Sequence, residues 1–445
     1  MASEAGMGWK RLEEGSYSNK GSGRFVIAFI YPAGVAIWWL SMLLALSVGA
    51  IFVTSTNSQA VSPKAPLRLY LDVDLTGARA SGVAIEQGVR TALAQDGGRF
   101  GDRPVQLVVL DNHGNSSRSL ANLKQFQTDP NGLAIIGGQH SAPLLAHRNY
   151  INDNKILMLV PWATAAPITR PKEQNNWIFR LSIDDQMVGE ALVGRAVDER
   201  GFSRLALLLE ESDWGKSNFH RMNDSLKDRG LVPVSTSYLA WGVSVPSANI
   251  LLREIYRSGA DAILMDATAQ EELAVLQAML NQPEDERLPV ISHWRVTGVD
   301  VSGALPHHAR KKLDLEFVQT RFSFLDMEQG SLGRQVFEQA QTLFPDIKRP
   351  SDITPPNGFT HAYDITRILQ AAVRQSGLTG DVAQDRAAVR AALENLGEPV
   401  EGLIKVYRKP FAPFDAESTD GHEALNLNDY TFGRFNEHDA IILSR

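Results

Sequence analysis

Few residues of this chain have the types and spacing that enzyme chemistry requires. Two carboxylates, Asp72 and Asp74, stand where a predicted strand at residues 67–73 ends, and His307 and His308 are adjacent histidines. Neighbouring residues on a helix or strand rarely converge on one metal ion, so we expect these histidines to lie in a solvated loop. The sequence therefore predicts no metal site.

The sequence also lacks the groups that usually carry catalysis or hold a cofactor. Cysteine is absent, which excludes thiolate nucleophiles, thiolate metal sites and disulfides. No Walker loop, Gly-x-Gly-x-x-Gly, His-Glu-x-x-His or Gly-x-Ser-x-Gly motif occurs. We therefore expect no cofactor and no enzyme activity.

One segment nevertheless offers an enzyme alternative. Asp72-Val73-Asp74-Leu75-Thr76 resembles the nucleophile motif of haloacid-dehalogenase-type phosphatases, in which the first carboxylate attacks phosphorus and the second transfers protons. That chemistry also needs a downstream lysine and an acidic pair that binds magnesium. Asp266 follows a predicted strand, but Glu271 and Glu272 lie in the next predicted helix. The resemblance thus covers five residues without evident partners.

The composition indicates a globular protein with more than one folded unit. Apolar residues make up 44% of the 445 residues and charged residues 21%, which is ordinary for globular proteins, and the length predicts two or three units. The 51 acidic and 44 basic residues give a net charge of -7, which argues against a nucleic-acid partner.

Residues 25–53 contain no acidic residue, lysine, arginine or histidine. Even if Pro32 ends a helix, residues 33–53 would span about 32 Å at about 1.5 Å per residue, enough to cross a bilayer. Basic residues are denser before this segment than after it, which predicts a cytoplasmic tail (1–24), a transmembrane helix (25–53) and an exported body. We expect a single-pass anchor in a bacterial inner membrane with the body in the periplasm. Cleavage after Ser58-Gln59-Ala60 is the alternative.

Beyond a linker at residues 54–66, short apolar strands alternate with helical patterns. The predicted strands lie at residues 67–73, 105–110, 133–136 and 156–160, and then at 205–209, 232–238, 262–265 and 290–292. Such strands, separated by helices, are typical of parallel sheets covered on both faces. The sequence predicts an α/β fold with two doubly wound parallel-sheet lobes, whose ligand binds outside the carboxyl ends of the strands.

Segments that follow these strands resemble, in order, those of the type I periplasmic solute-binding proteins, the family that serves branched-chain amino acid and amide ABC importers. They are Leu75-Thr76-Gly77, Val108-Val109-Leu110-Asp111-Asn112, Ala134-Ile135-Ile136-Gly137 with Ser141, Pro161-Trp162-Ala163-Thr164, Trp177-Ile178-Phe179-Arg180, and Asp213-Trp214-Gly215. The resemblance implies a three-stranded hinge with crossings near Arg180, Thr320 and Val400. Lobe 1 would comprise residues 67–181 and 320–400, and lobe 2 residues 182–319 and 401–445.

The resemblance also implies a ligand site at the strand ends. Its expected ligand-binding residues are Ser141, Trp162 and Thr164 from lobe 1, Trp214, Thr268 and Trp294 from lobe 2, and Arg79 beside the first segment. Hydroxyls and helix N-termini suit a carboxylate or amide oxygen, and three tryptophans suit an aromatic-walled cleft. Amino-acid-binding members hold the ligand ammonium with a carboxylate near the position of Trp294, where this chain has His293 and Arg295.

The expected function is therefore a membrane-tethered receptor that closes two lobes on a small solute for ABC-type import. The expected partners are a carboxylate, amide or amino-acid solute, the inner membrane and an ABC permease. A sensory or structural extracytoplasmic subunit of a membrane complex is the alternative, and the missing ammonium partner favours the structural form of it.

Overall fold

The computed structural model describes residues 65–171, 176–414 and 420–444. Its first sheet has the strand order β2-β3-β1-β4-β5-β6. The strands are β1 (Leu67–Val73), β2 (Arg99–Phe100), β3 (Arg103–Asp111), β4 (Gly132–Gly137), β5 (Met158–Val160) and β6 (Ile178–Arg180). All neighbours pair in parallel except the short β2–β3 hairpin. We call this sheet and the helices that cover it lobe 1.

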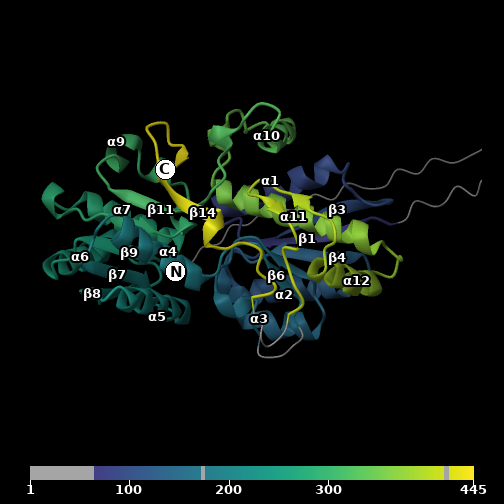
Figure 1. The fold of residues 1–445 in the computed structure, drawn as a ribbon, viewed down its shortest axis with the longest axis horizontal. Helices are drawn as coiled ribbons and strands as arrows, with labels where there is room; N and C mark the ends of the chain where they lie inside the picture. Colours follow the sequence, from purple (N-terminus) through teal and green to yellow (C-terminus); the bar gives the residue numbers. More distant parts are fainter. Residues whose placement is uncertain (1–64, 172–175, 415–419, 445) are drawn as a thin grey trace, which may run out of the picture. The chain divides into compact units, whose positions relative to one another are not determined.

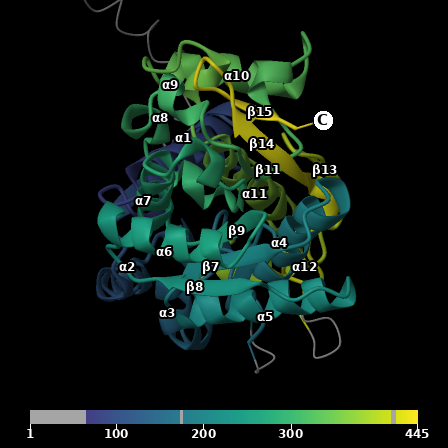
Figure 2. The same ribbon diagram turned by 90° about the vertical axis from the view of Figure 1, so that its left-hand side faces the viewer.

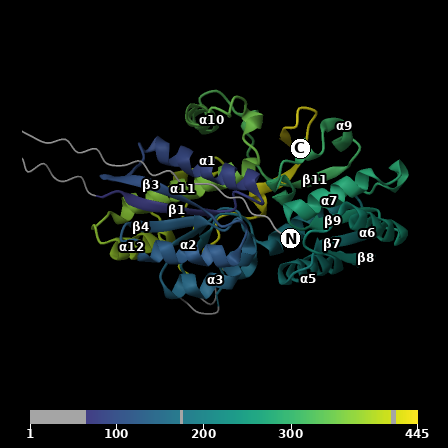
Figure 3. The ribbon, with the colours of Figure 1, turned by 180° about the vertical axis from the view of Figure 1, so that it is seen from behind.

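Helices cover both faces of the first sheet (Figures 1 and 3). One face carries α1 (Arg79–Gln95), α11 (Pro356–Ser376) and α12 (Val382–Glu394), and the other carries α2 (Ser116–Thr128) and α3 (Ser141–Asp153). Helix α10 (Leu332–Leu343) packs against α1. Because both faces are covered, the strands are almost continuously apolar, as in Leu133, Ala134, Ile135 and Ile136 of β4, all buried.

The second sheet is mixed rather than parallel throughout. Its strand order is β15-β14-β11-β10-β9-β7-β8, with β7 (Leu205–Glu210), β8 (Ser235–Leu239), β9 (Ala262–Asp266), β10 (Val290–Ser292), β11 (Leu315–Thr320), β14 (Tyr430–Phe435) and β15 (Ile441–Leu443). Strands β7 to β11 pair in parallel. Strand β14 pairs antiparallel with β11 and with β15. The prediction of a wholly parallel sheet was wrong here, because a short turn joins β14 to β15 and a tight hairpin permits only antiparallel pairing.

The second sheet and its helices form lobe 2, which Figure 2 views from its outer side. The helices are α4 (Asp185–Gly194), α5 (Asp213–Asp228), α6 (Val245–Arg257), α7 (Ala269–Leu280), α8 (Val301–Ala304) and α9 (His307–Arg310). The first residues of two of the helices have identifiable local causes. Ser212 caps α5 by accepting a hydrogen bond from the Gly215 N–H at 3.2 Å, and Pro356 opens α11, where a missing N–H costs nothing.

The chain passes between the two sheets at several points. Strand β6 of the first sheet is followed by α4 of lobe 2, and β11 of the second sheet is followed by α10 of lobe 1. The hairpin of β12 (Val400–Glu401) and β13 (Val406–Tyr407) precedes the return to β14. The predicted α/β class is confirmed, and the predicted lobe boundaries stay predictions.

The predicted transmembrane helix, residues 25–53, lies outside the described residues, as does the tail at residues 1–24. Among the residues that the structure describes, each helix is too short or too polar to cross a bilayer.

Candidate functional site

Five of the seven predicted ligand-binding residues are buried at the strand ends of the two sheets. Ser141 begins α3 after β4, and Trp162 and Thr164 follow β5, all in lobe 1. Trp214 lies in the first turn of α5, and Trp294 follows β10, both in lobe 2. The structure thus brings residues from both lobes into one buried region.

The other two predicted residues lie apart from this group. Arg79 is exposed, and its guanidinium donates to the Leu75 carbonyl at 3.4 Å. Thr268 is half-buried at the N-terminus of α7. Within the described part of the chain, we find no hydrogen bond or ring contact that joins either of them to the five buried residues.

Arg295, which was not among the predicted ligand-binding residues, occupies the centre of the region. It belongs to a 3-10 helix, η4 (Trp294–Gly298), and is 6% exposed. Its Nη2 lies 3.4 Å from Ser141 Oγ and 3.5 Å from Thr164 Oγ1, and its guanidinium carbon lies 4.2 Å from the Trp214 ring centroid. The signal in the sequence was its place directly after a strand, beside Trp294.

Aromatic rings form one wall of the region. The rings of Trp162 and Trp294 meet edge to face, with centroids 6.3 Å apart, and Tyr430 of β14 stacks on Trp294 at 5.5 Å. His361 of α11 contacts the edge of Trp294 at 5.9 Å. The wall therefore draws on both lobes and on the C-terminal segment.

Two buried carboxyl groups lie near the guanidinium. Asp185 accepts a hydrogen bond from the Trp214 indole at 2.5 Å, and Asp266 accepts one from the Asn218 amide at 2.6 Å. Burial raises the pKa of both carboxyl groups, and the proximity of Asp185 raises the pKa of Asp266 further, while Arg295 opposes both shifts. Burial therefore favours the neutral form of these acids.

Burial also disfavours the charged form of two histidines in the region. Burial lowers the pKa of His361 to about 4, and burial together with Arg295 places the pKa of His293 well below its ordinary value. The His361 Nδ1 lies 2.9 Å from the Pro161 carbonyl, to which it donates as the neutral imidazole. Arg295 is then the one group in this set whose positive charge is permanent.

Several buried polar atoms of the region have no hydrogen-bond partner among the described residues. They are Nε of Arg295, Nε1 of Trp294, Nε2 of His293, Nε2 of His361, Oδ1 of Asp185 and Oδ1 of Asp266. Buried polar groups are normally satisfied, so this concentration of unpaired donors and acceptors calls for a polar partner. A group that supplies both hydrogen-bond donors and acceptors would satisfy these atoms.

Residues 72–438 match the family model described as periplasmic binding protein. The chain belongs to this family. The match confirms the family that the strand-end segments predicted, and no curated protein matches over the chain.

Solved structures similar to this periplasmic binding protein are ABC-transporter solute-binding proteins of low sequence identity. A type 1 periplasmic binding protein from Bordetella pertussis has a TM-score of 0.68 at 16% identity, covering 85% of this chain and 99% of that one. A Rhodopseudomonas palustris protein in complex with p-hydroxybenzoic acid has a TM-score of 0.70 at 14% identity, covering 85% and 96%. A leucine-binding protein from Thermotoga maritima has a TM-score of 0.65 at 16% identity, covering 85% and 98%. At these identities the likeness shows the fold.

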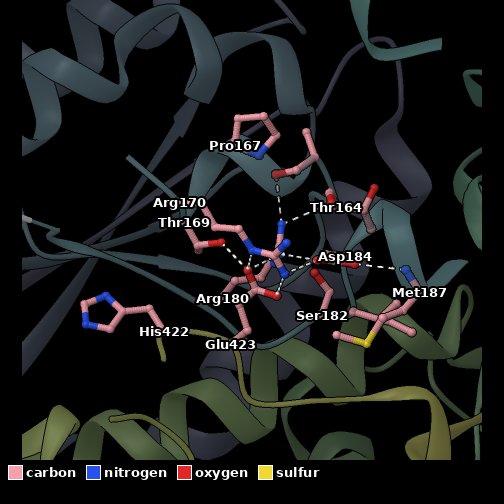
Figure 4. Close-up of polar contacts among 12 residues, drawn as sticks. Thr164, Pro167, Thr169, Arg170, Arg180, Ser182, Asp184, Met187, His422 and Glu423 are labelled. Carbon is pink, nitrogen blue, oxygen red and sulfur yellow. Dashed lines mark hydrogen bonds and ion pairs between the residues drawn. The ribbon is translucent and has the colours of Figure 1, made fainter. Parts of the chain in front are cut away.

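In this periplasmic binding protein, a buried ionic network fixes the backbone that carries Thr164 (Figure 4). Arg180 donates to the Thr164 carbonyl at 3.0 Å and pairs with Glu423 at 2.8 Å. Arg170 also pairs with Glu423, at 2.9 Å, and contacts Asp184. The network joins the end of β6 to the C-terminal segment, next to the site.

The carboxylates of the phosphatase-like segment serve as hydrogen-bond acceptors within the fold. Asp74 accepts from the N–H groups of Thr76, Gly77 and Ala78 at 2.7–3.0 Å, and so organises the turn into α1. Asp72 accepts from the Ser119 hydroxyl and the Asn122 amide, each at 2.6 Å.

Metal coordination finds no support in the described residues, where no cluster of three or more histidine, aspartate and glutamate side chains could hold an ion. His307 and His308 lie in the short helix α9, not in the loop that the sequence predicted. His422 is buried, with Nδ1 2.9 Å from the Ile178 carbonyl and Nε2 3.0 Å from Glu394, so both of its ring nitrogens already have partners.

Proposed function

We propose that this chain is a solute receptor whose two lobes close on a small carboxylate, with Arg295 as the group that binds the carboxylate. The observation that carries this proposal is the buried guanidinium of Arg295, whose Nε has no hydrogen-bond partner and whose Nη2 makes only long contacts with Ser141 and Thr164. A buried guanidinium with an unpaired N–H is costly, and a carboxylate offers it a bidentate partner.

The charges around Arg295 support an anion rather than a cation. Burial raises the pKa values of Asp185 and Asp266 and lowers those of His293 and His361. These shifts disfavour charge on all four groups, whereas the guanidinium of Arg295 keeps its charge. An ammonium group would meet the Arg295 guanidinium beside acids whose ionisation burial disfavours, so we propose a simple carboxylate ahead of an α-amino acid.

The aromatic side chains favour a carboxylate with an aromatic body. Trp162, Trp214 and Trp294 bring large ring surfaces to the region, and such surfaces bind a flat apolar group. Two of the structural neighbours from Rhodopseudomonas palustris hold benzoate or p-hydroxybenzoic acid. Benzoate-like carboxylates are therefore the first class of solute to test on this chain.

The experiment compares thermal unfolding of the full chain with benzoate and with benzamide, which has the same shape without the charge. We expect benzoate to raise the melting temperature, by the equivalent of about 2.7 kcal/mol at a concentration of 100 Kd, and benzamide to have little effect. Arg295→Met should abolish the benzoate shift, whereas Arg79→Met, at an exposed arginine outside the site, should retain it. Equal shifts with both solutes, or an unchanged benzoate shift in Arg295→Met, would contradict the proposal.

The receptor would deliver its bound solute to an ABC permease for import. The lobes would close about a three-stranded hinge formed by the crossings after β6, after β11 and before β14, and hinge closure of this kind is a binding device. The apolar segment at residues 25–53 would tether the receptor to the bacterial inner membrane with its body in the periplasm. Protease added to spheroplasts should then degrade the body, and alkaline carbonate should leave the chain in the membrane fraction.

A sensory or structural subunit is the second candidate, and one observation favours it. The Arg295 side chain itself bridges the lobes, since it extends from η4 of lobe 2 to the hydroxyls of Ser141 and Thr164 in lobe 1. A structural subunit is the better conclusion if no carboxylate, amide or amino acid changes the melting temperature and Arg295→Met lowers it in the absence of solute. Arg295 would then join the two lobes and bind no solute.

A further inference from the structure

Tyr430 lies where the chain returns to the second sheet. It is the first residue of β14, follows the third crossing between the sheets, and is 3% exposed. Its ring stacks on Trp294 of the candidate site, with centroids 5.5 Å apart and planes inclined by 15°. The same ring meets the edge of His361 at 6.2 Å. Tyr430 therefore supports the aromatic wall of the site.

The hydroxyl of Tyr430 contacts the first crossing. It accepts a hydrogen bond from the Ile183 N–H at 3.1 Å, and Ile183 lies between β6 of lobe 1 and α4 of lobe 2. Both residues are buried, and a buried N–H that loses its partner costs free energy because no water replaces it. The hydroxyl thus holds the first crossing against the third.

The backbone around Tyr430 contacts the second crossing. Tyr430 lies opposite Thr320, the last residue of β11, in the antiparallel pair of β11 and β14. The next residue along the chain, Arg321, donates its N–H to the Asp429 carbonyl at 2.9 Å. The Arg321 side chain donates to the Asn428 carbonyl, also at 2.9 Å. The three crossings and the aromatic wall therefore meet around Tyr430.

The two lobes touch each other in this arrangement. Gln270 of α7 donates to the Gly77 carbonyl of lobe 1 at 3.4 Å, and Arg295 bridges the lobes at the site. A hinge opens through dihedral changes in a few residues between elements. The hydrogen bond from Ile183 to Tyr430 joins two such segments, so we expect it to break when the lobes part. A contact present in one arrangement only stabilises that arrangement.

We propose that Tyr430 is a positioning residue that favours the closed arrangement of the lobes, an inference that rests on the proposed receptor function. Its hydroxyl fixes the first crossing against the third, and its ring holds Trp294 in place. Tyr430→Phe keeps the ring on Trp294 and removes only the bond to Ile183. It should therefore favour the open arrangement and weaken solute binding about three- to tenfold, the effect of losing one hydrogen bond.

The test measures the separation of the lobes in the full chain. Because the chain has no cysteine, two introduced cysteines can carry spin labels. Lys124 in α2 of lobe 1 and Lys227 in α5 of lobe 2 are exposed, so Lys124→Cys with Lys227→Cys reports this separation. Without solute, we expect Tyr430→Phe to lengthen the mean distance between the labels. Saturating benzoate should restore the shorter distance, since it binds the closed arrangement better.

Tyr70→Phe is the matched control. Tyr70 of β1 is also 3% exposed, and its hydroxyl donates to Asp129 at 2.8 Å within lobe 1. This variant thus removes a buried hydrogen bond away from the crossings, and it should change neither the distance between the labels nor the affinity for benzoate. An unchanged solute-free distance in Tyr430→Phe, or an equal lengthening in Tyr70→Phe, would overturn the inference.

Failure of the proposed receptor function gives a different result. If benzoate changes no distance in any of the proteins while Tyr430→Phe still lengthens the solute-free distance, the role of Tyr430 in the hinge holds and the solute assignment fails. If benzoate binds with the expected dependence on Arg295 while Tyr430→Phe has the same solute-free distance as the wild type, the receptor function holds and the role of Tyr430 fails.

Discussion

Arg180 Nη2 and Glu423 Oε1 lie 2.8 Å apart, and the two side chains are 0% and 2% exposed. The pair joins β6 of lobe 1 to the C-terminal segment that leads to β14 of lobe 2, and Arg170 strengthens it from the other side. Burial alone would raise the pKa of Glu423, but the guanidiniums of Arg180 and Arg170 hold it below its ordinary value.

Glu423→Gln should therefore destabilise the fold by about 3–5 kcal/mol at neutral pH, because the buried Arg180 loses its nearest counter-ion and keeps only Asp184, at 4.0 Å. A carboxyl with a lowered folded-state pKa stabilises the protein above its unfolded pKa and loses that effect as pH falls, so the cost of the substitution should shrink in acid. Urea unfolding at pH 7 and pH 4 measures both. Glu437→Gln, at an exposed glutamate, is the control, and an equal cost in both variants would contradict the role of the pair.

At Gly88, α1 packs closely against the backbone of α11. A Cβ at this position would lie 2.2 Å from the Phe359 carbonyl oxygen, a backbone atom. Gly88→Ala should cost about 1–3 kcal/mol, because the helices must separate, even though alanine favours a helix. Gly194→Ala in α4 is the matched control, since its Cβ would meet no atom closer than 3.6 Å. Thermal unfolding should show a loss only for Gly88→Ala, and equal melting temperatures would show that α1 and α11 can shift freely.

His361 should make the fold sensitive to mild acid. Burial lowers its pKa from 6.5 to about 4, so between these values the unfolded chain takes up a proton that the folded chain does not. Stability attributable to this group is present above pH 6.5 and is lost as pH falls to 4, by up to about 3 kcal/mol. His361→Gln should flatten the decline in the free energy of unfolding over this range. His438→Gln, at an exposed histidine, should not, and identical profiles for all three proteins would contradict the prediction.

Asp364 should act in the opposite direction to His361. Burial raises the pKa of its carboxyl to about 7, although the N–H groups of Leu403 and Ile404 and the Tyr407 hydroxyl oppose the shift. Since the folded chain keeps a proton that the unfolded chain loses above about pH 4, this group stabilises the fold in acid and loses that effect as pH rises to 7. The free energy of unfolding of the wild type minus that of Asp364→Asn should therefore fall from pH 5 to pH 7.5. A rise in this value over the same range would refute the assignment.

Much of the fold could be predicted from local patterns. The strands at residues 67–73 and 290–292 have the predicted bounds, because strands buried on both faces produce short continuous apolar runs. Strands β11 and β14 and helices α4, α10 and α12 were not predicted. In β14, for example, Tyr430, Thr431, Phe432, Gly433 and Arg434 mix apolar, polar and charged residues, and such a sequence matches no run of this kind.

The sequence by itself determined the succession of strands and helices, the family and the strand ends at which Ser141, Trp162 and Trp294 gather, since the periodicity of burial and the order of short segments are local properties of the chain. Only the tertiary structure decided that Arg295 lies at the centre of that region, that Glu423 pairs with Arg180, and that β14 and β15 run antiparallel. These are contacts between residues far apart in the chain, and they depend on how two sheets and a returning C-terminal segment pack, which no local pattern specifies.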